Sequence, residues 1–326
     1  MTRALLGVSL VLTWFLLFNV AGSLAVTAAL RLGAAAGWRA RTAGSLLGLR
    51  LLPSAAGLIG LVALVLPAYL WLEPAGAVEP LGPGLLSAAL VSTWLTGRAL
   101  LRAGRGWRLA HADVRAWLHD AERIDRAPFG REDDALPTYV VTDPRPIVAL
   151  AGVRRPRLFI ARQVAEQLSD EELSAAIAHE RGHLTARDNL KRLLLRACPD
   201  VLALLPAGRR LECAWIGAAE LAADARAVGA DEHRAAALAS AIVKVARMMP
   251  PPQPLAAPVS TLHDGGAIAD RIHQLVAPRG PQAVSARGPW ILTTAVVALA
   301  AIAAVEYPAL LSAVHQISEA LVRLFV

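Results

Sequence analysis

Residues 176–188 read AIAHERGHLTARD, a stretch in which two histidines stand four positions apart and a glutamate directly follows the first. On a helix, His179 and His183 share one face, so their imidazoles can point at a single ion. Glu180 then projects toward the place where a water bound to that ion would lie. The pattern predicts a hydrolytic zinc site on a helix, and the rest of the chain has to supply the third ligand.

The composition is that of a membrane protein. Of the 326 residues, 56% are hydrophobic and the mean hydropathy is +0.47, which is more apolar than a typical soluble domain. Four stretches approach the roughly 20 apolar residues that a bilayer-spanning helix needs. They cover about 4–30, 51–72, 81–101 and a segment that begins at Trp290. We expect four transmembrane helices, the first retained because its apolar run is longer than that of a signal peptide.

The basic residues predict the orientation in the membrane. The loop between the first two stretches and the segment after the third are rich in arginine: Arg31, Arg39, Arg41, Arg50, Arg98, Arg102, Arg105 and Arg108. Basic loops next to spans stay in the cytoplasm. Both termini are then outside, and residues 102–289 are cytoplasmic. The Arg- and Ala-rich composition suggests a bacterial protein, so the membrane is expected to be the cytoplasmic membrane. The net charge of +7 is therefore a topology signal, and no direct nucleic-acid partner is expected.

Residues 102–289 are predicted to form an α+β domain between the third and fourth spans. Apolar residues at helical spacing over 106–125 predict an amphipathic helix near the bilayer surface. Short β-rich stretches predict a small sheet with hairpin-like connections, whose edge could bind an extended peptide; these stretches are 138–141, 146–152 and 156–161.

The helix that carries the histidines has a clear start. Ser169 and Glu172 have the spacing of a capping box. Further helices are expected after Asp188, with a break at Pro199, and over about 210–228, 231–248 and 266–276.

The third ligand is predicted to come from the helix at 210–228. Glu220 and Asp224 stand four positions apart in the otherwise small and apolar run AAELAADARA, so this face should be packed against a neighbour. Glu220 would complete a set of two histidines and one glutamate and leave a position for water. Asp224 would accept a hydrogen bond from the outer nitrogen of a ligand histidine. Glu212 competes with Glu220 as the ligand, and both acids could instead be solvated helix residues.

The stretch DEELSAAIAHERGHLTARDNL, followed by ELAAD at 220–224, resembles the membrane-embedded gluzincin metallopeptidases of the BlaR/MecR type. Those are bacterial sensor-transducers with four spans and a cytoplasmic protease domain before the last span, and Arg187–Asp188 matches their post-motif pair. They carry a β-lactam-binding domain after the fourth span. Here only HQISEALVRLFV follows, so β-lactam sensing is not expected.

The related HtpX and CAAX-prenyl protease family shares the ligand pattern. In that family a histidine and an arginine follow in a late segment, and LHDGGAIADRI offers His263 and Arg271 in similar places. The resemblance implies that one of them could stabilise the oxyanion during peptide hydrolysis.

Together these features predict a zinc metalloendopeptidase with one Zn²⁺ per chain and Glu180 as general base. We expect a regulatory, signal-transducing protease that cuts a cytoplasmic repressor, itself or both. The alternative in the same class is a quality-control protease of the HtpX type. A non-catalytic membrane receptor is the alternative of another class, and the intact Glu180 argues against it because a scaffold needs no general base.

Overall fold

The computed structural model describes residues 3–35, 42–72, 82–124, 136–248, 259–261, 268–277 and 305–324. Among these residues, three helical stretches are long and apolar enough to cross a membrane. The first is α1 (Arg3–Ala35), and the third is α4 (Pro83–His119). The second consists of α2 (Ala43–Gly60), the π-helical η1 (Leu61–Val65) and α3 (Leu66–Leu72). The chain is mostly helical with a small sheet, as predicted, and is consistent with a membrane protein.

The second and third of these helices differ from the predicted bounds. The second begins at Ala43, because Thr42 caps it by accepting a hydrogen bond from the backbone N–H of Ser45. The third runs without a break to His119, so the helix predicted over 106–125 is present as far as His119, as a continuation of the third apolar stretch. Glycines on the way only weaken a helix, and no proline interrupts this one after its first turn.

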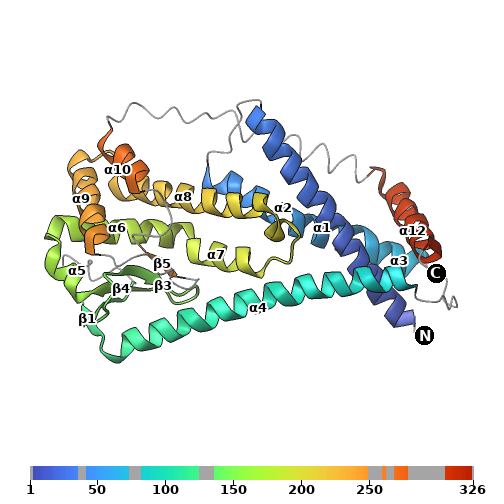
Figure 1. Ribbon diagram of the computed structural model, residues 1–326, viewed down its shortest axis with the longest axis horizontal. Coiled ribbons are helices and arrows are strands. Elements are labelled where there is room, and N and C mark those ends of the chain that lie inside the picture. The colour runs from blue at the N-terminus through green and yellow to red at the C-terminus, as the bar shows by residue number, and fades with distance from the viewer. Residues whose placement is uncertain are drawn as a thin grey trace.

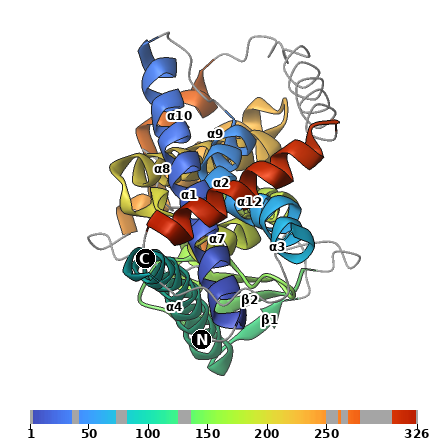
Figure 2. The ribbon, with the colours of Figure 1, turned by 90° about the vertical axis from the view of Figure 1, so that its right-hand side faces the viewer.

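The fourth predicted span lies partly outside the described residues, which resume at 305. Helix α12 (Tyr307–Leu324) joins the end of the predicted span to most of the segment that we expected to be a short tail. Its Leu311 and Val314 pack with Trp14 of α1 and Val65 of η1. The beginning of α1 and the end of α12 lie at the same end of the molecule, far from the sheet (Figure 1), and Figure 2 views this end along the long axis.

The sheet has five strands in the order β1-β2-β4-β3-β5. The three predicted strands are confirmed as β2 (Thr138–Val141), β3 (Val148–Ala151) and β4 (Arg157–Ala161). Of these three strands, β3 and β4 form a hairpin and β2 pairs with β4 in parallel. Gly152 makes the hairpin turn possible: its φ is +101°, and a Cβ there would lie 2.8 Å from the carbonyl oxygen of Arg155.

Two further strands were not predicted. β1 (Glu122–Ile124) falls within the predicted amphipathic helix, and β5 (Val259–Thr261) pairs antiparallel with β3. Three-residue strands are too short for an alternating pattern to reveal them. Because β5 covers the outer edge of β3, that edge of the sheet is already occupied by the chain itself.

Helices cover the sheet and extend toward the membrane helices (Figure 1). They are α5 (Arg162–Gln167), α6 (Asp170–Ala186), α7 (Asp188–Ala197), the 3₁₀ turn η2 (Leu202–Leu204), α8 (Pro206–Val228), α9 (Glu232–Met248) and α10 (Ile268–Val276). The predicted capping box at the start of α6 is confirmed, since Ser169 and Glu172 exchange side-chain and backbone hydrogen bonds. The main core joins the strands to α6 and α9 through residues such as Phe159, Ile177 and Leu238.

The connection between α7 and α8 docks onto the membrane helices. Asn19 of α1 donates to the carbonyl of Pro199 and accepts from the backbone N–H of Val201, both at 2.9 Å. Arg50 of α2 donates to Asp200 at 2.8 Å and to Glu212 of α8 at 2.9 Å. We call Asn19, Arg50, Asp200 and Glu212 the membrane latch. Arg50 was predicted to be a loop charge, but it lies inside α2, fully buried.

Candidate metal centre

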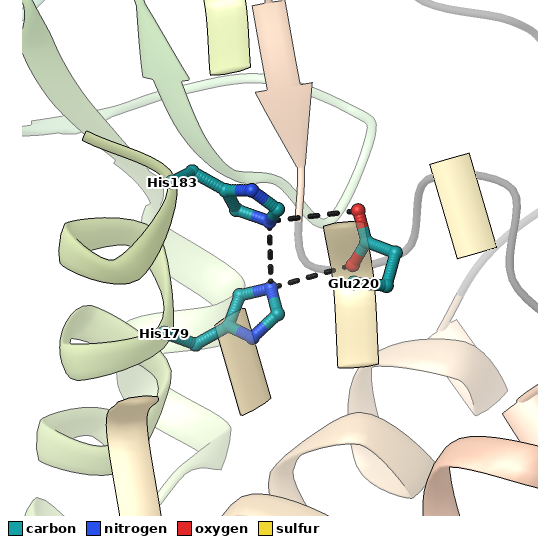
Figure 3. Close-up of side chains that lie close together, drawn as sticks. All are labelled: His179, His183 and Glu220. Atoms are coloured by element: carbon teal, nitrogen blue, oxygen red, sulfur yellow. Dashed lines mark hydrogen bonds and ion pairs between the residues drawn. The ribbon is translucent and has the colours of Figure 1, made fainter. Parts of the chain in front are cut away.

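Helices α6 and α8 bring His179, His183 and Glu220 together (Figure 3). The Nε2 atoms of the two histidines are 3.1 Å apart. They lie 3.4 and 3.5 Å from the two carboxylate oxygens of Glu220. All three residues are fully buried, and their candidate ligand atoms lie within 4.8 Å of one another. We call this group the metal centre, because it could hold a metal ion.

A small residue between the histidines lets the two helices approach. A Cβ placed on Gly182 would lie 3.1 Å from both the Cα and the carbonyl oxygen of Ala223 on α8. A larger residue at either position would push the helices apart. Gly182 and Ala223 therefore bring α8 close enough for Glu220 to face both imidazoles.

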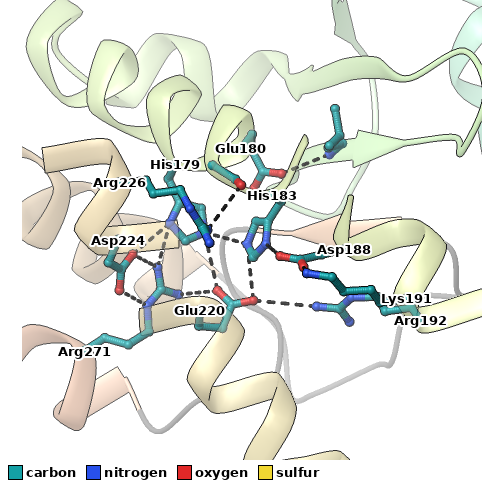
Figure 4. Close-up of polar contacts among 12 residues, drawn as sticks. His179, Glu180, His183, Asp188, Lys191, Arg192, Glu220, Asp224, Arg226 and Arg271 are labelled. Atoms are coloured by element: carbon teal, nitrogen blue, oxygen red, sulfur yellow. Dashed lines mark hydrogen bonds and ion pairs between the residues drawn. The ribbon is translucent and has the colours of Figure 1, made fainter. Parts of the chain in front are cut away.

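The outer nitrogen of each histidine contacts a carboxylate (Figure 4). His179 Nδ1 lies 2.8 Å from Asp224, the partner expected from the sequence, and His183 Nδ1 lies 2.8 Å from Asp188. An ionised carboxylate can only accept, so each Nδ1 donates, and in the neutral ring Nε2 then carries a lone pair. Two lone pairs and a carboxylate that converge on one point fit a bound cation.

The carboxylates around the metal centre favour positive charge there. Burial lowers the pKa of His183, but Asp188 and Glu220 outweigh it and raise that pKa to about 10. Burial also opposes the charged form of His179, whose pKa is nevertheless raised by Asp224 and Glu220. For Glu220 burial acts upward, yet its contacts with both histidines hold its pKa well below the usual range. The site thus stabilises positive charge beside a carboxylate that stays ionised.

Glu180 sits between the metal centre and the sheet. Its Oε2 accepts a hydrogen bond from the backbone N–H of Leu150 on β3 at 3.2 Å. The side chain is fully buried, and burial raises its pKa to about 7. A carboxylate with a pKa near neutrality is well matched to taking up and releasing a proton.

Arg271 of α10 is engaged by the carboxylates of α8. Its Nε and Nη2 donate to Asp224 at 2.8 and 2.7 Å, and its Nη1 lies 3.2 Å from Glu220. The residue is 2% exposed, so it is buried behind the ligands. His263, the other candidate oxyanion donor, lies outside the described residues.

Glu212, the competing ligand, is not part of the metal centre. It belongs to the membrane latch, where its Oε1 accepts from both Nε and Nη2 of Arg50. The choice between the two glutamates therefore falls on Glu220.

The structure adds three residues to which the sequence analysis gave no role. Asp188 orients His183, and Arg192 of α7 lies 3.7 Å from Glu220 and over the ring of Trp215. Asn189 donates to the carbonyls of Leu150 and Gly152, which fixes β3 beside α7. The position of Asp188 in the sequence could have indicated this role. It follows the last residue of the histidine helix by two positions, where the chain can fold back onto that helix.

The family comparison agrees with this geometry. A family model described as Peptidase family M48 matches residues 115–249, a range that includes His179, Glu180, His183, Glu220 and Asp224. Peptidases of this family are metal-dependent, typically on zinc, so the match supports a metallopeptidase. No curated protein matches the chain.

Proposed function

We propose that this protein is a membrane-embedded zinc endopeptidase that cuts protein substrates on the cytoplasmic side. The observation that carries the proposal is the buried metal centre of His179, His183 and Glu220 (Figure 3) with Glu180 beside it (Figure 4). The ligand set of two imidazoles and one carboxylate is that of catalytic zinc sites, which keep one position open for water.

The chain's own residues would divide the chemistry as follows. A zinc ion at the metal centre would polarise the substrate carbonyl and acidify the attacking water. Glu180, with its pKa raised to about 7, would take a proton from that water and pass it to the leaving amine. Asp188 and Asp224 would hold the imidazoles in the tautomer that exposes Nε2.

We assign Arg271 to positioning rather than to oxyanion stabilisation. Its guanidinium contacts Asp224 and Glu220, which supports a role in fixing the ligand and its neighbour. The carbonyl of the substrate would have to displace these contacts to reach it.

The cytoplasmic orientation is part of the proposal. The core between α8 and the membrane helices includes Val26, late in α1, and Leu46, early in α2. The catalytic helices thus dock near the ends joined by the arginine-rich loop, which the positive-inside rule assigns to the cytoplasm. A reporter fused after His119 should behave as cytoplasmic and one fused at Gly76 as external; the reverse pattern would overturn the orientation.

Two biological roles fit this enzyme. The resemblance to the BlaR/MecR type supports a regulatory role, in which the protease cuts a cytoplasmic repressor or itself. The docking of α7 and α8 on membrane helices through the membrane latch favours the second candidate, cleavage of membrane proteins at the bilayer surface. Comparing the peptides released in cells that carry active or Glu180→Gln protein would separate the two roles by the identity of the substrate.

The activity itself is tested with purified protein in detergent. Glu180→Gln should lower kcat/KM on an unfolded protein such as casein by roughly 10²- to 10⁴-fold, the usual contribution of a general base. Its zinc content should not change, because Glu180 is not a ligand. Glu166→Gln, an exposed glutamate on α5, is the matched control and should cleave like wild type. Equal rates for wild type and Glu180→Gln would contradict the enzyme proposal.

A further inference from the structure

A cavity of about 420 Å³ lies next to the metal centre. It is formed between the β3–β4 turn and the junction of α6 with α7, and His183 and Asp188 contribute to its wall. Leu150, Leu184 and Leu190 give it an apolar lining. A peptide bound across the metal centre could therefore place a nearby side chain in this cavity, since an extended chain advances only about 3.3 Å per residue.

Two arginines give this cavity a positive rim. Arg154, in the β3–β4 turn, and Arg187, between α6 and α7, both line it and are exposed. Within the described part of the chain neither guanidinium has an acidic partner. The one acid in the wall, Asp188, is already bound by His183 and by Lys191 at 2.9 Å. The positive charge at the rim is thus not neutralised by the wall.

The backbone at Arg187 does not explain its side chain. Arg187 is the only non-glycine residue with positive φ among the described residues; its φ is 55° and its ψ is 40°. Its N–H caps α6 by donating to the carbonyls of His183 and Leu184. This left-handed turn returns Asp188 toward His183, but glycine adopts it without steric cost. Glycine would therefore suit the backbone at this position, and the turn does not explain why the residue is an arginine.

We propose that this cavity is a substrate subsite for an acidic side chain, glutamate or aspartate, close to the scissile bond. The inference rests on the proposed peptidase function. The apolar lining would contact the methylene groups, and Arg154 and Arg187 would bind the carboxylate by charge-assisted hydrogen bonds. β5 pairs with β3 only as far as Ala151, so the turn at Gly152–Arg154 lies beyond the strand pairing.

The experiment measures specificity. Wild-type protein in detergent is given a peptide library from a digested cell extract, and the cleavage sites are read by mass spectrometry. Glutamate or aspartate should be enriched at one position near the cut. For a matched peptide pair with glutamate or glutamine at that position, kcat/KM should differ by about tenfold at low salt, and the ratio should shrink as ionic strength rises.

Substitutions of the rim arginines test whether they produce the preference for an acidic side chain. Arg154→Gln combined with Arg187→Gly should bring the ratio of the two peptides close to one, and glycine suits the turn, so the fold is kept. Arg154→Glu should shift the preference toward a lysine peptide. Arg155→Gln removes an exposed arginine that does not line the cavity and should keep the wild-type ratio. A ratio near one in wild type, or an unchanged ratio in the double variant, would overturn the subsite.

The subsite and the proposed function fail in different ways. Cleavage without acidic preference would overturn the subsite alone, whereas wild-type protein that cleaves no more than Glu180→Gln would overturn the peptidase. Binding of the two fluorescently labelled peptides to Glu180→Gln protein repeats the comparison without turnover. A tighter complex with the glutamate peptide supports the subsite, and equal affinities contradict it.

Discussion

Two polar clusters share helix α8, and they differ in the source of their positive charge. In the membrane latch, Arg50 donates to both Asp200 and Glu212. In the metal centre, the two imidazoles turn their Nε2 atoms toward each other and toward Glu220. The latch contains its own cation, whereas the side chains of the metal centre could hold a metal ion. The first arrangement is suited to holding helices together and the second to binding a metal.

Two glutamates of α8 have different roles because different helices face them. Glu212 and Glu220 lie on the same helix about two turns apart. Glu212 meets α2 with its arginine, while Glu220 meets α6 with its two histidines. The role of each carboxylate is therefore decided by the helix that faces it.

The largest expected effect comes from removing the latch's cation. Arg50→Met would leave Asp200 buried without its partner, which should lower the free energy of unfolding by about 3–5 kcal/mol. Chemical unfolding in detergent measures this loss. Arg50→Met with Asp200→Asn should recover much of it, because no buried charge remains. A loss below about 1 kcal/mol in the single variant would contradict the structural role of the latch.

The matched control is Glu212→Gln. Its side chain is 38% exposed, and partly exposed ion pairs contribute only about 0–1 kcal/mol. If Glu212→Gln destabilises the protein as much as Arg50→Met does, Asp200 is not the residue that makes the latch strong.

A smaller effect is expected from the metal centre's supporting carboxylate. Asp224→Asn weakens the partner of His179 and Arg271 but leaves the ligands in place. Zinc affinity should fall by about 10- to 100-fold, as is usual for such outer partners. Competition with a chelator of known affinity measures it. Asp231→Asn, on the surface, should bind zinc like wild type, and an unaltered affinity in Asp224→Asn would count against the assignment.

The smallest expected effect on stability comes from the ion pair of Glu172 and Lys244, which lies outside both clusters. Burial opposes the charge of Glu172, but Lys244, Ser240 and the cap at Ser169 outweigh it and lower its pKa below the ordinary 4.5. The carboxylate therefore contributes stability above pH 4.5, and this contribution is lost as the pH falls through the lowered pKa. Glu172→Gln should cost about 1 kcal/mol at neutral pH.

The pH dependence of the unfolding free energy tests this contribution of Glu172. The difference in unfolding free energy between wild type and Glu172→Gln should shrink below pH 4.5. A difference that grows on acidification would show that the carboxylate is not stabilised in its charged form.

Much of the metal centre could be predicted from the sequence because its parts follow local rules. Helical spacing puts His179 and His183 on one face, and the capping box at Ser169 fixes where their helix begins. Spacing within a second helix singled out Glu220 and Asp224 as a pair. It could not choose between Glu212 and Glu220, because that choice depends on which helices pack together.

The features that the sequence analysis missed are set by long-range contacts. Arg50 looks like a charge flanking a span until Asp200, far along the chain, is brought beside it. β5 is only three residues long and is defined by its pairing with β3. α4 continues past the membrane segment because Trp117 near its end packs on Phe159 and donates to Asp143. None of these partners is marked by a local pattern.

The most direct test of the metal centre is the zinc content of three purified proteins. Wild type and Glu212→Gln should each carry one zinc per chain, whereas Glu220→Gln should carry close to none after dialysis against a weak chelator. Full zinc occupancy in Glu220→Gln, or its loss in Glu212→Gln, would contradict the assignment of His179, His183 and Glu220 as the ligands.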